Sequence, residues 1–189
     1  MFAQSKAGIE QYSYIGTQTD AVIVPSLHFQ SASNWYAELR YNYEDAQTLS
    51  LYGGKIIEGG NGLEYSITPM IGFSAGLFTG ISFATNAEAE WKNFYLSSQT
   101  QYSVAVKEDC ENFFFSWSEL GYNISDYFFT GLAMQYTGQK GYRDFEPGFV
   151  AGLTLKNFSF PFYVFSPFDS GRYFILGVNY EYNFKKKKK

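Results

Sequence analysis

Apolar and polar residues alternate along most of this sequence, most clearly in residues 35–44 and most weakly in residues 6–16. In residues 35–44 the odd positions carry Trp, Ala, Leu, Tyr and Tyr, and the even positions carry Tyr, Glu, Arg, Asn and Glu. Because successive side chains of a β-strand point to opposite faces, this pattern predicts a strand that separates two different environments. Residues 63–74 repeat the pattern. No segment of helical length shows a 3.6-residue period, so we predict an all-β fold.

Twelve segments carry the alternation, and we therefore predict a single antiparallel β-barrel of about twelve strands, with an even count between 8 and 14 left open. The expected strands are residues 6–16, 20–31, 34–44, 46–57, 63–74, 77–86, 89–106, 112–123, 127–137, 146–156, 158–166 and 171–184. The segment 89–106 is long enough to hide a turn or bulge at residues 97–99. The segment 112–123 changes phase near Glu119, which a β-bulge would explain.

The expected connections alternate in length along the chain. Those after even-numbered strands are short, as at residues 32–33 and 87–88, whereas residues 107–111 and 138–145 form longer connections after odd-numbered strands. Outer-membrane barrels have short periplasmic turns and longer extracellular loops. The sequence therefore predicts that both chain ends lie at the short-turn, periplasmic end.

Composition indicates which environment the apolar face meets. A soluble sandwich or lipocalin-like barrel also alternates, but its outer face would be rich in Lys, Glu and Arg. Here charged residues are 17% and aromatic residues 21% of the chain, and the polar faces consist mainly of Ser, Thr, Asn, Gln, Gly and Tyr. Membrane barrels have an apolar outside and a polar inside, so the composition favours a transmembrane barrel over the soluble alternative.

Charge and cysteine content exclude several classes of function. The formal net charge is −4, and residues 185–189 supply five of the 14 basic residues, so the rest of the chain is strongly acidic. A general nucleic-acid binder would have the opposite sign. With Cys110 as the one cysteine, neither a disulfide within the chain nor a cysteine-based metal site can form. We expect no metal or cofactor, a barrel domain over residues 1–184, and an appended or solvated lysine tail over residues 185–189.

The last expected strand carries the most specific motif. One of its faces consists of aromatic and aliphatic side chains at every second position, namely Phe174, Leu176, Val178, Tyr180, Tyr182 and Phe184. This strand resembles the C-terminal assembly signal of bacterial outer-membrane β-barrel proteins, which ends in Phe. The resemblance implies an outer-membrane location, contact with outer-membrane lipid and recognition by the barrel assembly machinery. The sequence departs from the signal because the lysine tail follows Phe184.

The opposite, polar faces of the strands are expected to line the lumen. The residues assigned to the lumen are Ser26, His28, Tyr36, Glu38, Arg40, Asn42, Glu64, Gln99, Gln101, Gln135, Asn179 and Glu181. Glu38, Arg40 and Glu44 follow one another along one face, and two interpretations stay open. They form a charge ladder that selects ions, or they neutralise one another inside a barrel filled by its own side chains.

Three functions follow from this barrel. The first is a narrow passive channel for small polar solutes or ions, since twelve strands lie between filled eight-stranded barrels and open 16-stranded porins. In size the chain is similar to twelve-stranded channels for acidic oligosaccharides, but three Arg in all are too few for a basic lumen. The second is a closed structural barrel that binds other outer-membrane proteins. The third is a lipid-modifying enzyme using Ser26 and His28. It is disfavoured because residues two apart on a strand rarely form a catalytic triad, and we assign no catalytic residue.

Overall fold

The computed structural model describes residues 4–16 and 21–184. The expected lysine tail, residues 185–189, lies outside this part of the chain. The strands are β1 (Lys6–Gly16), β2 (Val22–Gln30), β3 (Trp35–Tyr41), β4 (Leu49–Lys55), β5 (Ile57–Gly60), β6 (Glu64–Ala75), β7 (Gly80–Trp91), β8 (Phe94–Ala105), β9 (Phe113–Asn123), β10 (Phe128–Gln139), β11 (Tyr142–Leu155), β12 (Phe158–Phe165) and β13 (Tyr173–Asn183). The expectation of an all-β chain is confirmed.

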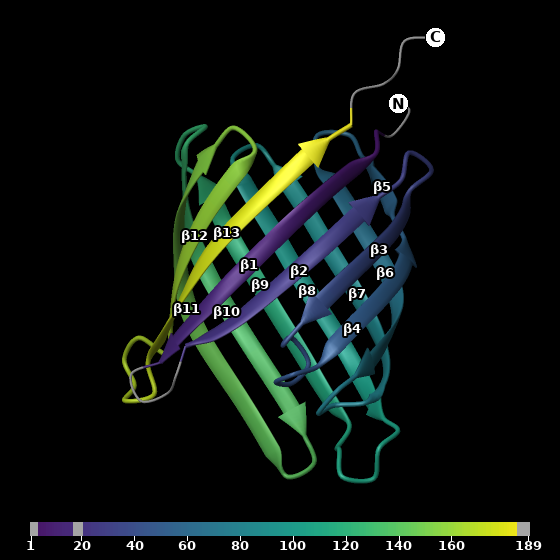
Figure 1. Ribbon diagram of the computed structural model, residues 1–189. Coiled ribbons are helices and arrows are strands. Elements are labelled where there is room, and N and C mark those ends of the chain that lie inside the picture. Colours follow the sequence, from purple (N-terminus) through teal and green to yellow (C-terminus); the bar gives the residue numbers. More distant parts are fainter. Residues whose placement is uncertain (1–3, 17–20, 185–189) are drawn as a thin grey trace.

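The strands form one closed antiparallel barrel (Figure 1). Apart from β4 and β5, strands that are adjacent in sequence are adjacent in the sheet. The ring closes because β1 pairs with β13 and β4 pairs with β6. β4 and β5 lie end to end along β6 and together occupy one position, so the barrel has the predicted twelve strand positions. The interruption lies where their common register brings Pro69 opposite Lys55. Proline has no N–H to donate to the ladder.

Both described chain ends lie at the same end of the barrel, where the backbone N–H of Phe184 donates to Ser5 (Figure 1). We call this the terminal end and the opposite one the loop end. Tight turns join strands at the terminal end, for example after Leu155, whereas Asn42 to Thr48 and Ser166 to Arg172 connect strands at the loop end. The predicted difference between the two ends is therefore present.

Two predicted connections are wrong. β7 continues through residues 87–88 and turns at Lys92, whose φ is 56°. The small outward-facing Ala87 and Ala89 weakened the apolar pattern there. β10 and β11 extend through the expected loop at 138–145 and turn at Lys140 and Gly141, whose φ of 76° is readily adopted by glycine.

The two expected irregularities are also absent from the described strands. β8 runs without a turn or bulge at residues 97–99, and β9 keeps one register with both neighbours through Glu119. The phase of β9 looked broken because the usual polarity is reversed. Ser116 and Ser118 face outward and hydrogen-bond across to Thr100 and Ser98 at 3.0 and 2.8 Å, while Trp117 faces inward and is buried.

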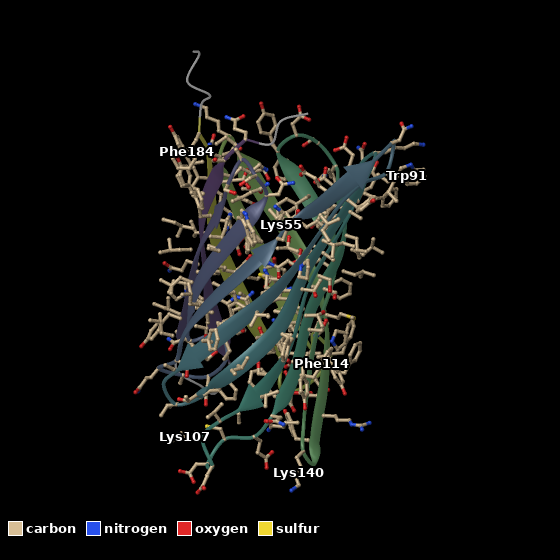
Figure 2. The ribbon with its side chains drawn as sticks, turned by 90° about the vertical axis from the view of Figure 1, so that its right-hand side faces the viewer. Lys55, Trp91, Lys107, Phe114, Lys140 and Phe184 are labelled. Carbon is tan, nitrogen blue, oxygen red and sulfur yellow. The ribbon has the colours of Figure 1, made fainter. Side chains whose placement is uncertain are left out.

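The outer face of the barrel is apolar. Leu39, Ile67 and Leu176 are exposed on it, and every strand carries exposed large aliphatic or aromatic side chains. Figure 2 shows side chains that project outward along the length of the barrel. Towards the terminal end, the ammonium groups of two lysines lie over tryptophan rings, Lys55 over Trp35 at 4.8 Å and Lys92 over Trp91 at 4.6 Å. Trp and Lys residues near one end of a transmembrane barrel are typical of the membrane–water interface.

No helix in the described residues is long and apolar enough to cross a membrane.

Candidate functional site

The interior contains two chambers, one towards each end of the barrel. The terminal chamber has a volume of about 630 Å³ and is lined by side chains that include Glu10, Tyr36 and Glu119. The loop chamber has a volume of about 680 Å³, and its lining includes Phe113 and Glu146. Val24 and Tyr43 contribute to both chambers. The two spaces therefore meet at one layer of side chains in the middle of the barrel.

Arg40 is the centre of this layer and is 1% exposed. Its guanidinium group forms a bidentate ion pair with Glu38, in which Nε donates to Oε1 at 2.9 Å and Nη2 donates to Oε2 at 3.1 Å. Nη1 donates across the lumen to the side-chain oxygen of Gln101 at 2.9 Å. The guanidinium carbon lies 4.4 Å from the ring centre of Tyr43 and 4.2 Å from that of Tyr52. Such a planar cation, hydrogen-bonded at its edges and stacked on its faces, is held in one orientation.

Tyr43 and Glu44 reach the layer because the connection between β3 and β4 folds into the lumen. Asn42 has a φ of 58°, and its side chain accepts a hydrogen bond from the backbone of Gln47 at 2.7 Å. The chain therefore leaves the strand after Tyr41 and turns inward. The Tyr43 hydroxyl donates to Gln99 at 2.6 Å, and the buried Glu44 carboxylate accepts hydrogen bonds from Tyr52 at 2.7 Å and from Ser50.

The sequence placed Asn42 on the lumen face of a strand and Tyr43 on the apolar face. Asn42 does line the lumen, although from a connection, whereas the placement of Tyr43 is wrong. The alternation continued to residue 44 although the strand ends at Tyr41. Asn42 lies in the connection and lines the loop chamber, and Tyr43 points inward. An Asn at the end of an alternating run was the available signal, since Asn tolerates the left-handed conformation that ends strands.

An aromatic wall lies beside this layer, on β1, β9 and β12. The ring centre of Trp117 is 5.3 Å from that of Tyr12 and 5.1 Å from that of Tyr163. Phe165 packs on Trp117 with its ring centre at 5.9 Å. The Tyr163 hydroxyl donates to Glu119 at 2.8 Å, so one carboxylate is attached to this wall.

The structure gathers most of the residues assigned to the lumen around the two chambers. Those lining the terminal chamber are Ser26, His28, Tyr36, Glu38, Gln99, Asn179 and Glu181. Gln135 lines the loop chamber, and Arg40 and Gln101 are buried in the layer between the chambers. Glu64 has the inward register at the terminal end of β6 but is exposed. Whether these residues line a path for solutes stays a prediction.

Several acidic residues of the interior were missed. Glu10, Glu88, Glu90 and Glu119 line the terminal chamber, and Glu146 lines the loop chamber. Glu10 was hidden in a segment of weak alternation, and Glu88 and Glu90 were hidden by the misplaced turn. The inward sequence of Glu10, Tyr12 and Tyr14 was the signal available for β1. The lumen is therefore more acidic than predicted.

The imidazole of His28 lies near Glu10 and Tyr36. Its Nδ1 lies 3.9 Å from Glu10 Oε1, beyond hydrogen-bond distance, and its ring stacks on Tyr36 with the centres 6.1 Å apart. Among the hydrogen bonds of residues 4–16 and 21–184, none joins His28 to Ser26. In the same part of the chain, no three His, Cys, Asp or Glu side chains lie close enough together to hold a metal ion.

β13 shows the two faces expected of an assembly strand. Leu176, Val178, Tyr182 and Phe184 are exposed on the outside, whereas Ile175 is fully buried inside. The strand pairs with β1 along its whole length. Recognition of this strand by the assembly machinery stays a prediction.

Comparison with solved structures identifies the fold. A KdgM porin superposes with a TM-score of 0.65 and 12% sequence identity over 92% of this chain and 98% of its own. The chain therefore has the fold of the bacterial outer-membrane porins. The NanC porin has a TM-score of 0.57 and 9% identity over 94% of this chain and 100% of its own. OccAB4 from Acinetobacter baumannii has a TM-score of 0.51 and 12% sequence identity over 96% of this chain and 62% of its own.

A second KdgM structure with a TM-score of 0.66 and 12% identity is of the porin in complex with disordered oligogalacturonate; it covers 92% of this chain and 98% of its own. No protein-family model and no curated protein matches the sequence significantly. The porin fold confirms the predicted barrel, and these structural neighbours are porins rather than enzymes.

Proposed function

We propose that this porin-like barrel is a passive channel of the bacterial outer membrane for small polar solutes or ions. Its exterior is apolar on all strands while its interior carries carboxylates, amides and hydroxyls. A closed ring of strands also leaves no unpaired backbone edge in lipid. Outer-membrane lipid is then its solvent, and the barrel assembly machinery its partner during insertion.

The observation that carries the proposal is the pair of chambers. Together they extend from both ends towards the middle of the barrel, and one layer of side chains around Arg40 and Tyr43 separates them. In the described chain no folded domain fills the lumen. Tyr43 belongs to a connection rather than to a strand, so the separation of the two chambers depends in part on one short segment. Such a layer acts as a filter for size and charge.

The charge of the lumen argues against carrying over the polyanionic ligand of the KdgM structure. The inward carboxylates of Glu10, Glu88, Glu119 and Glu146 have no Lys or Arg within 4 Å among the described residues. The positive charge of the buried Arg40 is neutralised by its ion pair with Glu38. An acidic lumen enclosed by a wall of low dielectric constant attracts cations and repels anions, so we expect small cations and neutral polar solutes to pass.

Swelling of liposomes tests this function and the role of Tyr43. Liposomes containing the folded protein should swell in small neutral sugars faster than empty liposomes. Tyr43→Ala should increase the rate because it removes the ring shared by both chambers. Tyr41→Ala is the matched control, since Tyr41 is the last residue of β3, two positions before Tyr43, and is exposed on the outer face. Equal swelling of empty liposomes, wild type and Tyr43→Ala would refute the channel.

The hydrogen bonds across the layer favour one second candidate, a closed barrel that binds other outer-membrane proteins. Arg40 donates to Gln101, and Tyr43 donates to Gln99, so β3 and the connection after it are joined to β8 across the lumen. These contacts seal the barrel if they persist in the membrane. A wild type that behaves as empty liposomes, together with a Tyr43→Ala variant that swells, would support the closed barrel. We propose no catalytic role for His28.

A further inference from the structure

The terminal chamber combines carboxylates with aromatic rings in a way that the channel function does not require. Its acidic lining consists of Glu10, Glu38, Glu58, Glu88, Glu90, Glu119 and Glu181. Its aromatic lining consists of Tyr12, Tyr36, Tyr43, Tyr95, Trp117, Phe129 and Tyr163. A passage for inorganic ions needs the charge but not the rings, which prompts the question of what chemistry both would recognise together.

Two walls of the chamber each place a carboxylate beside rings. On one wall Glu119 accepts a hydrogen bond from Tyr163, whose ring packs against Trp117 with centres 5.1 Å apart. On the other wall the Tyr36 hydroxyl donates to Glu38 at 3.2 Å, and Glu10 lies near His28. A cation between these walls lies close to negative charge and to several aromatic rings.

The carboxylates are spread around the chamber and do not converge on one point. No three acidic, His or Cys side chains of the described chain are close enough for a metal ion. Of the chamber's carboxylates, Glu38 is paired with Arg40 and Glu181 with Lys6, at 3.5 Å. The remaining negative charge is thus diffuse and matches a large cation better than a small hard one.

Buried polar atoms provide an independent sign of a ligand. Trp117 is 7% exposed, and its Nε1 has no hydrogen-bond partner in the described chain. Asn86 Oδ1, Asn179 Oδ1 and the Tyr95 hydroxyl are likewise buried without a partner, and all four residues line the terminal chamber. Buried polar groups are normally satisfied. A ligand with a hydroxyl group, which can both donate and accept a hydrogen bond, would complement part of this set.

We propose that the terminal chamber binds organic ammonium cations and selects them over neutral molecules of the same shape. The inference rests on the proposed function for its biological use, as the selectivity site of the channel, but binding itself does not require conduction. Aromatic cages recognise ammonium groups through cation–π attraction, and the uncompensated carboxylates add long-range attraction. The chamber volume of about 630 Å³ accommodates a molecule of this class.

Calorimetry on the folded protein in detergent tests the proposal without any need for conduction. The probes are choline, its neutral isostere 3,3-dimethyl-1-butanol and the anion 3,3-dimethylbutyrate. We expect choline to bind about tenfold more tightly than the neutral isostere, and the anion not to bind. Glu119→Gln keeps the acceptor for Tyr163 but removes the charge, and Glu10→Gln is the second variant. Each should weaken choline binding severalfold.

Glu146→Gln is the matched control because it removes the same charge from the loop chamber. It should leave choline affinity unchanged. Equal affinity for choline and its isostere would overturn the proposal, as would equal losses in Glu119→Gln and Glu146→Gln. Removing residues 185–189 should not weaken binding. Choline binding without conductance would refute the channel and leave this inference standing. Conductance without choline binding would refute this inference and leave the channel standing.

Discussion

Replacing Arg40 tests whether the layer between the chambers excludes water, as the low exposure of its charged side chains indicates. Arg40→Gln removes the cation that lies 2.9 Å from Glu38 and 3.8 Å from Glu44. The side chains of these three residues are at most 5% exposed. Removing one partner of a buried ion pair costs about 3–5 kcal/mol because the other charge stays buried and uncompensated. We expect the free energy of unfolding to fall by about that amount.

Urea unfolding in lipid vesicles, followed by tryptophan fluorescence, measures the change. Adding Glu38→Gln and Glu44→Gln to the Arg40→Gln background should recover much of the loss, because the uncompensated charges are then gone. The control is Lys6→Gln, whose partner Glu181 and own side chain are 46% and 41% exposed, and which should cost about 0–1 kcal/mol. If Arg40→Gln costs no more than Lys6→Gln, the layer is hydrated and the reasoning fails.

Two further predictions concern the membrane. Leu39→Arg places a charge on the lipid-facing side and should cost about 2–4 kcal/mol in the same vesicle assay if Leu39 lies near the bilayer midplane; a negligible cost would mean that this face does not meet lipid. Phe184→Ala should reduce the fraction of protein inserted in the outer membrane, measured by cell fractionation, whereas deletion of residues 185–189 should leave insertion equal or higher. Loss of insertion on deletion would show that the tail is functional.

The barrel was predictable because its environment imposes a simple code. Lipid outside and polar groups inside force alternation with a period of two, and Leu39 next to Arg40 shows that code clearly. The position of each strand followed from the code wherever the outward residues were large. It failed at Ala87 and Ala89, which are too small to mark the lipid face. It also failed at Ser116 and Ser118, whose hydroxyl groups face outward and hydrogen-bond to Thr100 and Ser98 on the neighbouring strand.

The layer between the chambers was only partly predictable. Glu38 and Arg40 could be placed in the lumen because they alternate with Ala37 and Leu39 on a regular strand. Their partner Gln101 lies on β8, and a partner so distant in the sequence follows from barrel closure rather than from local pattern. Tyr43 enters the lumen through a positive φ at Asn42. Asn42 itself was the one local signal for this turn, and the alternation that continues to residue 44 concealed it.

The most direct test of the channel is the reversal potential of purified protein in a planar bilayer across a KCl gradient. The account predicts a small conductance with weak preference for K⁺ over Cl⁻, because the inward carboxylates outnumber the inward cations. High salt should reduce this preference through screening. No resolvable conductance from folded protein would contradict the channel and support a closed barrel. A preference for Cl⁻ would show that the assignment of the acidic lumen is wrong.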